Sequence, residues 1–102
     1  MDYKIIWSPE AIEDLQSIAE YIQRDSEFYG RAVVAKILEV SRSIKDFPLI
    51  GKIVPELENE NIRERFVYSY RLVYQIKKQQ ILIVAVIHGR RLFETITERF
   101  EG

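Results

Sequence analysis

Residues 62–91 read IRERFVYSYRLVYQIKKQQILIVAVIHGRR, and this stretch decides the fold class. Arginines alternate with apolar and aromatic residues over 62–68 and 70–77, a pattern typical of two β-strands. Residues 81–87 are apolar without alternation, so we expect a strand whose two faces are both covered. Lys78-Gln79 predicts a tight turn between the last two strands. The stretch therefore predicts three consecutive antiparallel strands, followed by His-Gly-Arg-Arg.

A strand and two helices are expected before this stretch. Residues 3–7 form a short β-rich run, and Ser8 then offers an N-cap with Pro9 at the first helical position. Apolar residues recur at helical spacing over 9–24, and again in a second helix that Ser26 caps. Because the link between the two helices is short, they should form an antiparallel hairpin.

The second helix is expected to end at Phe47, because Pro48 pushes the residue before it out of the α region. Residues 48–61 contain two prolines and a glycine and predict a loop. At the C-terminus, apolar residues four apart predict a short helix over 92–100. Residues 94–97 also alternate as a strand would, so this segment is open to either interpretation from the residues alone.

This order predicts an α+β fold, β-α-α-β-β-β with a short C-terminal helix. The helical hairpin should pack on one face of a curved, mainly antiparallel sheet of four strands. We expect the second strand to run antiparallel to the first, and the uncovered face or the sheet's edge to be free for function. Residues 1–102 should form a single domain.

Charge is unevenly distributed along the chain. Residues 1–61 carry seven Lys or Arg against twelve Asp or Glu, whereas residues 62–102 carry eight against four. The two segments therefore have net charges of −5 and +4 inside a chain of net charge −1. Such a split predicts a basic face that engages phosphates or an acidic protein segment. The alternative is ordinary variation on a solvated surface.

Composition excludes several classes of protein. The chain has no cysteine and one histidine, which argues against disulfides and a structural zinc site, and we expect no cofactor. Residues 1–10 lack the basic and apolar regions of a signal peptide. The apolar run 81–87 is far shorter than the ~20 residues that span a bilayer. A soluble, cytoplasmic protein with no membrane partner is expected.

Four motifs in order make the chain resemble the RelE/ParE toxins of bacterial type II toxin–antitoxin pairs. They are W-S-P-E-A-x-x-D-L at 7–15, F-P-x-x-G-K-x-V-P-E-L at 47–57, Y-R-L-V-Y at 70–74 and V-x-H-G-R-R at 86–91. The resemblance covers nearly the whole chain and implies a toxin neutralised in a hetero-oligomer by a cognate antitoxin, whose C-terminal segment wraps it. It implies one of two targets: the ParE-like branch poisons DNA gyrase, and the RelE-like branch cleaves mRNA in the ribosome.

The branch decides whether the protein is an enzyme. RNA cleavage needs a base, cations on the phosphate and an acid for the leaving oxygen. For a RelE-like nuclease, the resemblance implies a catalytic set of Glu56 as base, Arg71 on the phosphate and His88 as acid. Its strand lysines are replaced here by Ile62 and Glu64, and its late tyrosine by Thr97, near the same place. The isoelectric point near 5.9 is also low for a protein that enters the ribosome.

We therefore favour the ParE-like branch, with the mRNA endoribonuclease as the alternative. The candidate target- or phosphate-binding residues are Arg63, Arg65, Arg71, Arg90 and Arg91. Each has a structural alternative that the sequence leaves open. Arg71 would instead form an ion pair with Glu64 or Glu56, and Arg63 and Arg65 would lie on an exposed strand face.

Overall fold

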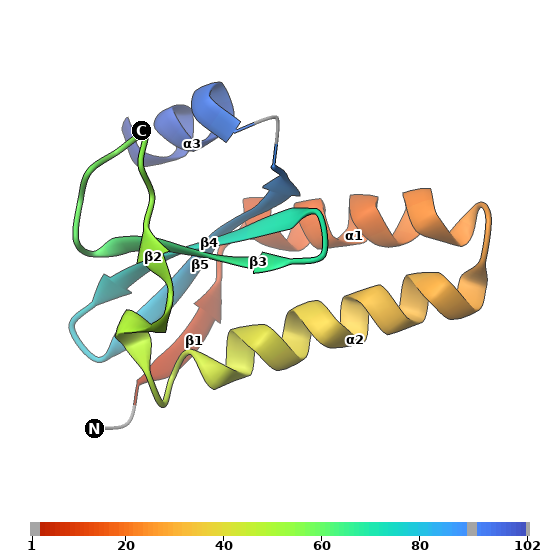
Figure 1. Ribbon diagram of the computed structural model, residues 1–102, viewed down its shortest axis with the longest axis horizontal. Coiled ribbons are helices and arrows are strands. Elements are labelled where there is room, and N and C mark those ends of the chain that lie inside the picture. Colours follow the sequence, from red (N-terminus) through yellow and green to blue (C-terminus); the bar gives the residue numbers. More distant parts are fainter. Residues whose placement is uncertain (1–2, 90–91, 102) are drawn as a thin grey trace.

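The computed structural model describes residues 3–89 and 92–101. Their elements are β1 (Lys4–Trp7), α1 (Pro9–Gln23), α2 (Glu27–Ser43), the 3₁₀ turn η1 (Pro48–Ile50), β2 (Lys52–Ile53), β3 (Ile62–Val67), β4 (Tyr70–Lys77), β5 (Gln80–His88) and α3 (Leu92–Glu101). The α+β class, the helical hairpin, the three C-terminal strands and the C-terminal helix are confirmed (Figure 1).

Both predicted helix caps are present. The hydroxyl of Ser8 accepts a hydrogen bond from the Ala11 amide at 3.1 Å, and that of Ser26 accepts one from the Tyr29 amide at 3.1 Å. Each cap satisfies a donor that the first helical turn would leave free. The second helix ends at Ser43, earlier than predicted, and the chain reaches Phe47 through tight turns. Phe47 itself, at φ −140° and ψ 76°, lies outside the α region, which the following proline disfavours.

The sheet has five strands, not the predicted four, in the order β1-β5-β4-β3-β2. The loop predicted over 48–61 contains η1 and the extra edge strand β2, which pairs antiparallel with β3. The prediction that the second strand runs antiparallel to the first was wrong. β5 pairs parallel with β1, and the β3-β4-β5 meander alternates, so β3 has the same sense as β1.

The position of β5 explains this arrangement. As predicted, β5 is buried on both faces, and it lies in the interior of the sheet between β1 and β4. An apolar strand of this kind leaves the least apolar surface in water when it is central, because both faces and both edges are then covered. After β1, the helical hairpin connects the chain to the opposite edge of the sheet, at β2. The β3-β4-β5 meander then returns, so that β5, its most apolar strand, lies beside β1.

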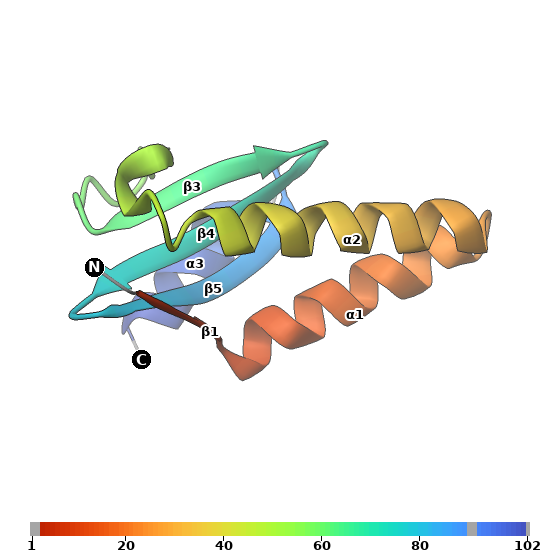
Figure 2. The same cartoon turned by 90° about the horizontal axis from the view of Figure 1, so that it is seen from below.

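The two faces of the sheet are covered differently. The hairpin of α1 and α2 lies on one face and α3 on the other (Figure 2). The larger core cluster joins the hairpin to residues such as Leu72, Tyr74 and Ile83, and a smaller one packs Ile96 of α3 against Val73. The second face is therefore not free along its whole length. The part that remains accessible lies towards β2 and β3.

Candidate functional site

A cluster of charged side chains is centred on Arg71, on the α3 side of the sheet. Its Nη1 and Nη2 atoms donate to the two carboxylate oxygens of Glu56, each at 3.1 Å. Its Nε and Nη2 atoms also contact Oε1 of Glu64. One guanidinium therefore links β4, β3 and the loop after β2. The bidentate contact with Glu56 is the strongest geometry available to an arginine and a carboxylate.

This cluster is largely removed from water. The side chains of Arg71, Glu56 and Glu64 are 8%, 24% and 1% exposed. The hydrogen bond from Arg71 lowers the pKa of Glu56, and burial only partly opposes it. Burial alone would lower the pKa of Arg71, but the hydrogen bonds to Glu56 and Glu64 outweigh it and raise that pKa. The lowered pKa of Glu56 and the raised pKa of Arg71 keep these two groups charged at neutral pH.

An aromatic side chain borders the ion pairs. Phe66 pairs with Arg71 across the β3-β4 ladder and is 53% exposed. The guanidinium carbon of Arg71 lies 5.9 Å from the ring centre, and Nζ of Lys52 lies 5.2 Å from it, within the range of cation–π attraction. A Cβ placed on Gly89 would lie 3.9 Å from the Phe66 ring and 4.0 Å from Cδ of Arg71. We call Lys52, Glu56, Glu64, Phe66 and Arg71 the Arg71 cluster.

Two other predicted arginines lie on the opposite side of the sheet from Arg71. Arg63 pairs with Tyr74 and Arg65 with Leu72, both residues of the hairpin-facing core. Arg63 donates to the carbonyl oxygens of Glu60 at 2.9 Å and Gly51 at 2.9 Å. Arg65 donates to the hydroxyl of Ser43 at 3.4 Å, at the end of α2. Both guanidinium groups thus bond within the chain. The candidates Arg90 and Arg91 lie outside the described residues.

His88 is also separated from the Arg71 cluster. Its ring lies 6.0 Å from that of Tyr70 at 84°, an edge-to-face contact. Both rings line a groove of about 550 Å³ with Ile18 and Tyr21 of α1, on the hairpin side. Of the residues implied for a RelE-like nuclease, the structure therefore brings Glu56 and Arg71 together and leaves His88 on the other face.

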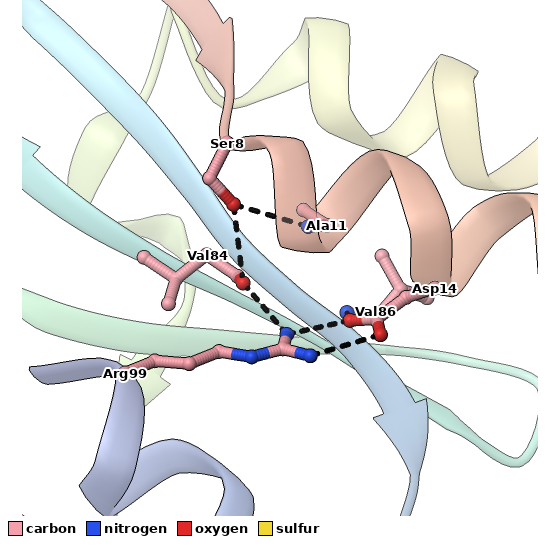
Figure 3. A network of polar contacts seen from close by, with 6 residues as sticks. All are labelled: Ser8, Ala11, Asp14, Val84, Val86 and Arg99. Carbon is pink, nitrogen blue, oxygen red and sulfur yellow. Dashed lines mark hydrogen bonds and ion pairs between the residues drawn. The ribbon is translucent and has the colours of Figure 1, made fainter.

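A second polar network, around Arg99, had no signal in the sequence (Figure 3). Nη1 and Nη2 of Arg99 in α3 donate to the carboxylate of Asp14 in α1 at 2.7 and 3.0 Å. Nη1 also donates to the carbonyl of Val84 at 2.9 Å, and the Val86 amide donates to Asp14 at 3.0 Å. Asp14 raises the pKa of Arg99, although burial opposes this. Because Asp14 and Arg99 lie 85 positions apart in the chain, no local sequence pattern predicts their contact.

A bulge in β5 creates the place for this network. Val73 pairs with Ala85 and Tyr74 with Ile83, which leaves Val84 as the extra residue. β1 ends opposite Ile83, so no further strand residue covers this edge of β5. The side chains of Ser8, Asp14 and Arg99 take the backbone groups that a longer β1 would have bonded.

Comparison with known proteins adds a family to this geometry. The family model described as the ParE toxin of type II toxin–antitoxin systems, parDE, matches residues 5–93, from β1 to the start of α3. The chain belongs to the ParE toxin family. Its match includes every described member of the Arg71 cluster and Asp14 of the second network. No curated protein sequence matches the chain.

Solved structures of similar fold include a ParDE system, a RelE toxin and a YoeB toxin. The chromosomal ParDE system of P. aeruginosa is similar at a TM-score of 0.71 and 18% identity, over 84% of this chain and 95% of that one. A double arginine variant of E. coli RelE in the free state gives 0.70 and 18%, over 99% and 97%. The YoeB dimer from Staphylococcus aureus gives 0.60 and 23%, over 87% and 99%. At these identities the likeness is one of fold.

The described residues contain no helix with both the length and the apolar character that a bilayer crossing requires.

Proposed function

We propose that this ParE-family protein is a toxin that inhibits DNA gyrase and is neutralised by a cognate antitoxin. The choice of gyrase as the target rests on one observation, the contacts that Arg71 makes. Four of its contacts go to the carboxylates of Glu56 and Glu64, so its Nε, Nη1 and Nη2 atoms are all engaged. A phosphate would have to displace Glu56 and approach Glu64, which electrostatic repulsion opposes.

The alternative is a ribosome-dependent mRNA endoribonuclease, and one observation favours it. Arg71 orients Glu56, which lies at the accessible end of the cluster. A general base would have to occupy such an accessible position. Two features oppose this function. The lowered pKa of Glu56 makes it a weaker base, and the imidazole of His88 lies on the other face of the sheet. Missing general acid–base groups typically cost 10²–10⁴-fold in rate, by the usual magnitude of such catalysis.

The toxin claim is tested by expression with and without the antitoxin. Expression of this chain alone should stop growth. Co-expression of the cognate antitoxin, from the small gene adjacent to that of this chain, should restore growth. Membership of the ParE family, the toxins of type II toxin–antitoxin systems, supports this expectation. Normal colony growth with soluble toxin verified in the cells would overturn the claim.

The target is tested with the purified protein in two assays run side by side. We expect it to block DNA supercoiling by gyrase, or to trap cleaved DNA with gyrase, and to leave ribosome-bound mRNA intact. Cutting of mRNA in the ribosomal A site would favour the nuclease instead. Loss of that cut in both Glu56→Ala and His88→Ala would assign the roles of base and acid to those residues.

Arg90 and Arg91, candidates from the sequence for binding the target or a phosphate, are also expected to contact the acidic antitoxin. Gly89, directly before them in the chain, lies beside Phe66 and Arg71. Reversing both charges, in Arg90→Glu/Arg91→Glu, should weaken the complex with the antitoxin and reduce its dependence on salt, because exposed charge pairs are screened. Equal affinity of the variant and the parent chain at low and moderate salt would contradict this assignment.

A further inference from the structure

The segment from Phe47 to Ile53 exposes four large apolar side chains within seven residues. Phe47 and Leu49 are each 67% exposed, Ile50 is 48% exposed and Ile53 is 38% exposed. Single exposed apolar residues are ordinary, but a group of this kind on one short segment marks a surface that meets another molecule. We call residues 47–53 the apolar loop. It contains η1 and β2, and lies at the sheet edge furthest from β1 in the strand order.

The apolar loop is held in place from inside the protein. The fully buried Tyr74 donates its hydroxyl to the carbonyl of Pro48 at 2.7 Å and accepts from the Gly51 amide at 2.9 Å. Arg63 donates to the carbonyls of Gly51 at 2.9 Å and Leu49 at 3.3 Å. A Cβ on Gly51 would lie 2.6 Å from the Tyr74 hydroxyl, so only glycine fits there. The exposed side chains are therefore presented on a preorganised backbone, which lowers the entropy cost of binding.

The loop also offers backbone hydrogen bonds. β2 is the edge strand, and its only strand neighbour among the described residues is β3. The Val54 amide bonds to the carbonyl of Ile62 at 3.1 Å, which fixes the alternation along β2. The N–H and C=O of Ile53 consequently point away from β3, towards the open edge. An extended segment of a partner can pair there, as in other cases of strand addition.

Charge distinguishes this surface from the other apolar one. Residues 42–53 carry Arg42, Lys45 and Lys52 against Asp46 alone, and all four are exposed. The tip of the helical hairpin also exposes aromatic side chains, such as Phe28 at 82%, but residues 20–31 carry two arginines against three acids. Of these two surfaces in the described part of the chain, the apolar loop is the one that combines apolar anchors, an open strand edge and an excess of positive charge.

We infer that the apolar loop and the outer edge of β2 dock an acidic, extended segment of the antitoxin, whose apolar side chains cover Leu49, Ile50 and Ile53. This inference rests on the proposed function in taking the antitoxin as the partner. The acidic side chains of the segment meet Lys45 and Lys52, and its backbone continues the sheet beyond β2. The aromatic tip of the hairpin takes no part in this contact.

The test measures the affinity of the purified product of the adjacent small gene for this chain by calorimetry. Leu49→Ser/Ile50→Ser should weaken binding by about 10-fold or more, the effect of losing well-packed anchors. The matched control is Tyr21→Ser/Phe28→Ser at the hairpin tip, which should bind within about twofold of the parent chain. Thermal unfolding of both variants separates a binding defect from a folding defect.

Two further variants test the charge and the edge separately. Lys45→Glu/Lys52→Glu should weaken binding most at low salt. Ile53→Pro should bind more weakly than Ile53→Ala, because proline removes only the amide that faces the open edge. If the parent chain binds and is neutralised while every loop variant binds equally well, the docking surface is wrong and the proposed function stands. If the parent chain neither arrests growth nor binds, both are wrong.

Discussion

Arg71 and Arg99 both come from the positively charged C-terminal segment, and both form ion pairs inside the molecule. Arg71 bonds to two carboxylates that are 7 and 15 residues away, in the neighbouring strand and its adjoining loop. Arg99 bonds to one carboxylate 85 residues away, and so joins α3 to α1. The Arg71 pair with Glu64 is almost fully buried, whereas Arg99 and Asp14 keep 18% and 15% of their side chains exposed.

The comparison shows how a charge count differs from a charged surface. Of the eight basic residues in 62–102, Arg63, Arg65, Arg71 and Arg99 donate hydrogen bonds within the chain. Arg71 neutralises charge that would otherwise be buried alone, and Arg99 connects distant elements. The positive charges of residues 62–102 therefore serve in large part as hydrogen-bond donors inside the molecule. This difference predicts that the two arginines fail in different ways when they are replaced.

The largest effect is expected at Arg71. Arg71→Met should destabilise the fold by about 3–5 kcal/mol, because it leaves the charge of Glu64 buried without a partner. Urea denaturation should show a lower midpoint for the whole molecule. If Arg71 served mainly as a phosphate ligand, the variant would instead keep its stability and lose only its activity.

A double variant separates the charge from the packing. Arg71→Met/Glu64→Leu removes both members of the buried pair, and apolar replacements of such pairs are often neutral. We expect the double variant to recover most of the stability that Arg71→Met loses. If the stability lost in the double variant equalled the sum of the losses in Arg71→Met and Glu64→Leu, the two side chains would not interact energetically.

A smaller and more local effect is expected at Arg99. Arg99→Met should cost about 1–3 kcal/mol, since the hydrogen bonds to Asp14 are charged but partly exposed. Hydrogen exchange should quicken first in α3, because this side chain ties that helix to α1 and β5. Asp14→Asn is the matched control and should give the same pattern. Uniform loss of protection across the sheet would contradict a local role.

The smallest effect is expected at Glu56 and depends on pH. The pKa of Glu56 is lowered in the folded protein, so its contribution is present above the unfolded pKa and is lost as pH falls through the folded pKa. Glu56→Gln should therefore be less stable than the parent chain by about 1–2 kcal/mol at neutral pH. The difference between the two unfolding curves should shrink as the solution is acidified, and a constant difference would exclude the ion pair as its cause.

The elements of the fold were largely predictable because their signals are local. The caps at Ser8 and Ser26 and the uninterrupted apolar run of β5 are each set by neighbouring residues. The parallel pairing of β1 with β5 was not predictable in this way, since it joins residues 76 positions apart, such as Lys4 and Gln80. β2 was missed because two residues are too few to show an alternation.

The same distinction between local and long-range signals applies to the residues of the candidate site. Motif positions alone led to Glu56 and Arg71, and the contact between them was one of two readings that the sequence left open. His88 is the last residue of β5, where the motif places it, but its face of the sheet depends on the register of β5 against β4. Lys52 and Phe66 had no signal, because a cation–π contact between neighbouring strands follows from their pairing.

The sequence by itself determined the family, the helices, the meander and the apolar character of β5, because propensity, capping and periodicity act over a few residues. Tertiary structure alone decided which charges are exposed. It buried Arg71 between two carboxylates, turned Arg63 towards the apolar loop and bound Arg99 to Asp14. The physical reason is that a buried charge needs a partner in space, and the chain brings that partner from any distance along its length.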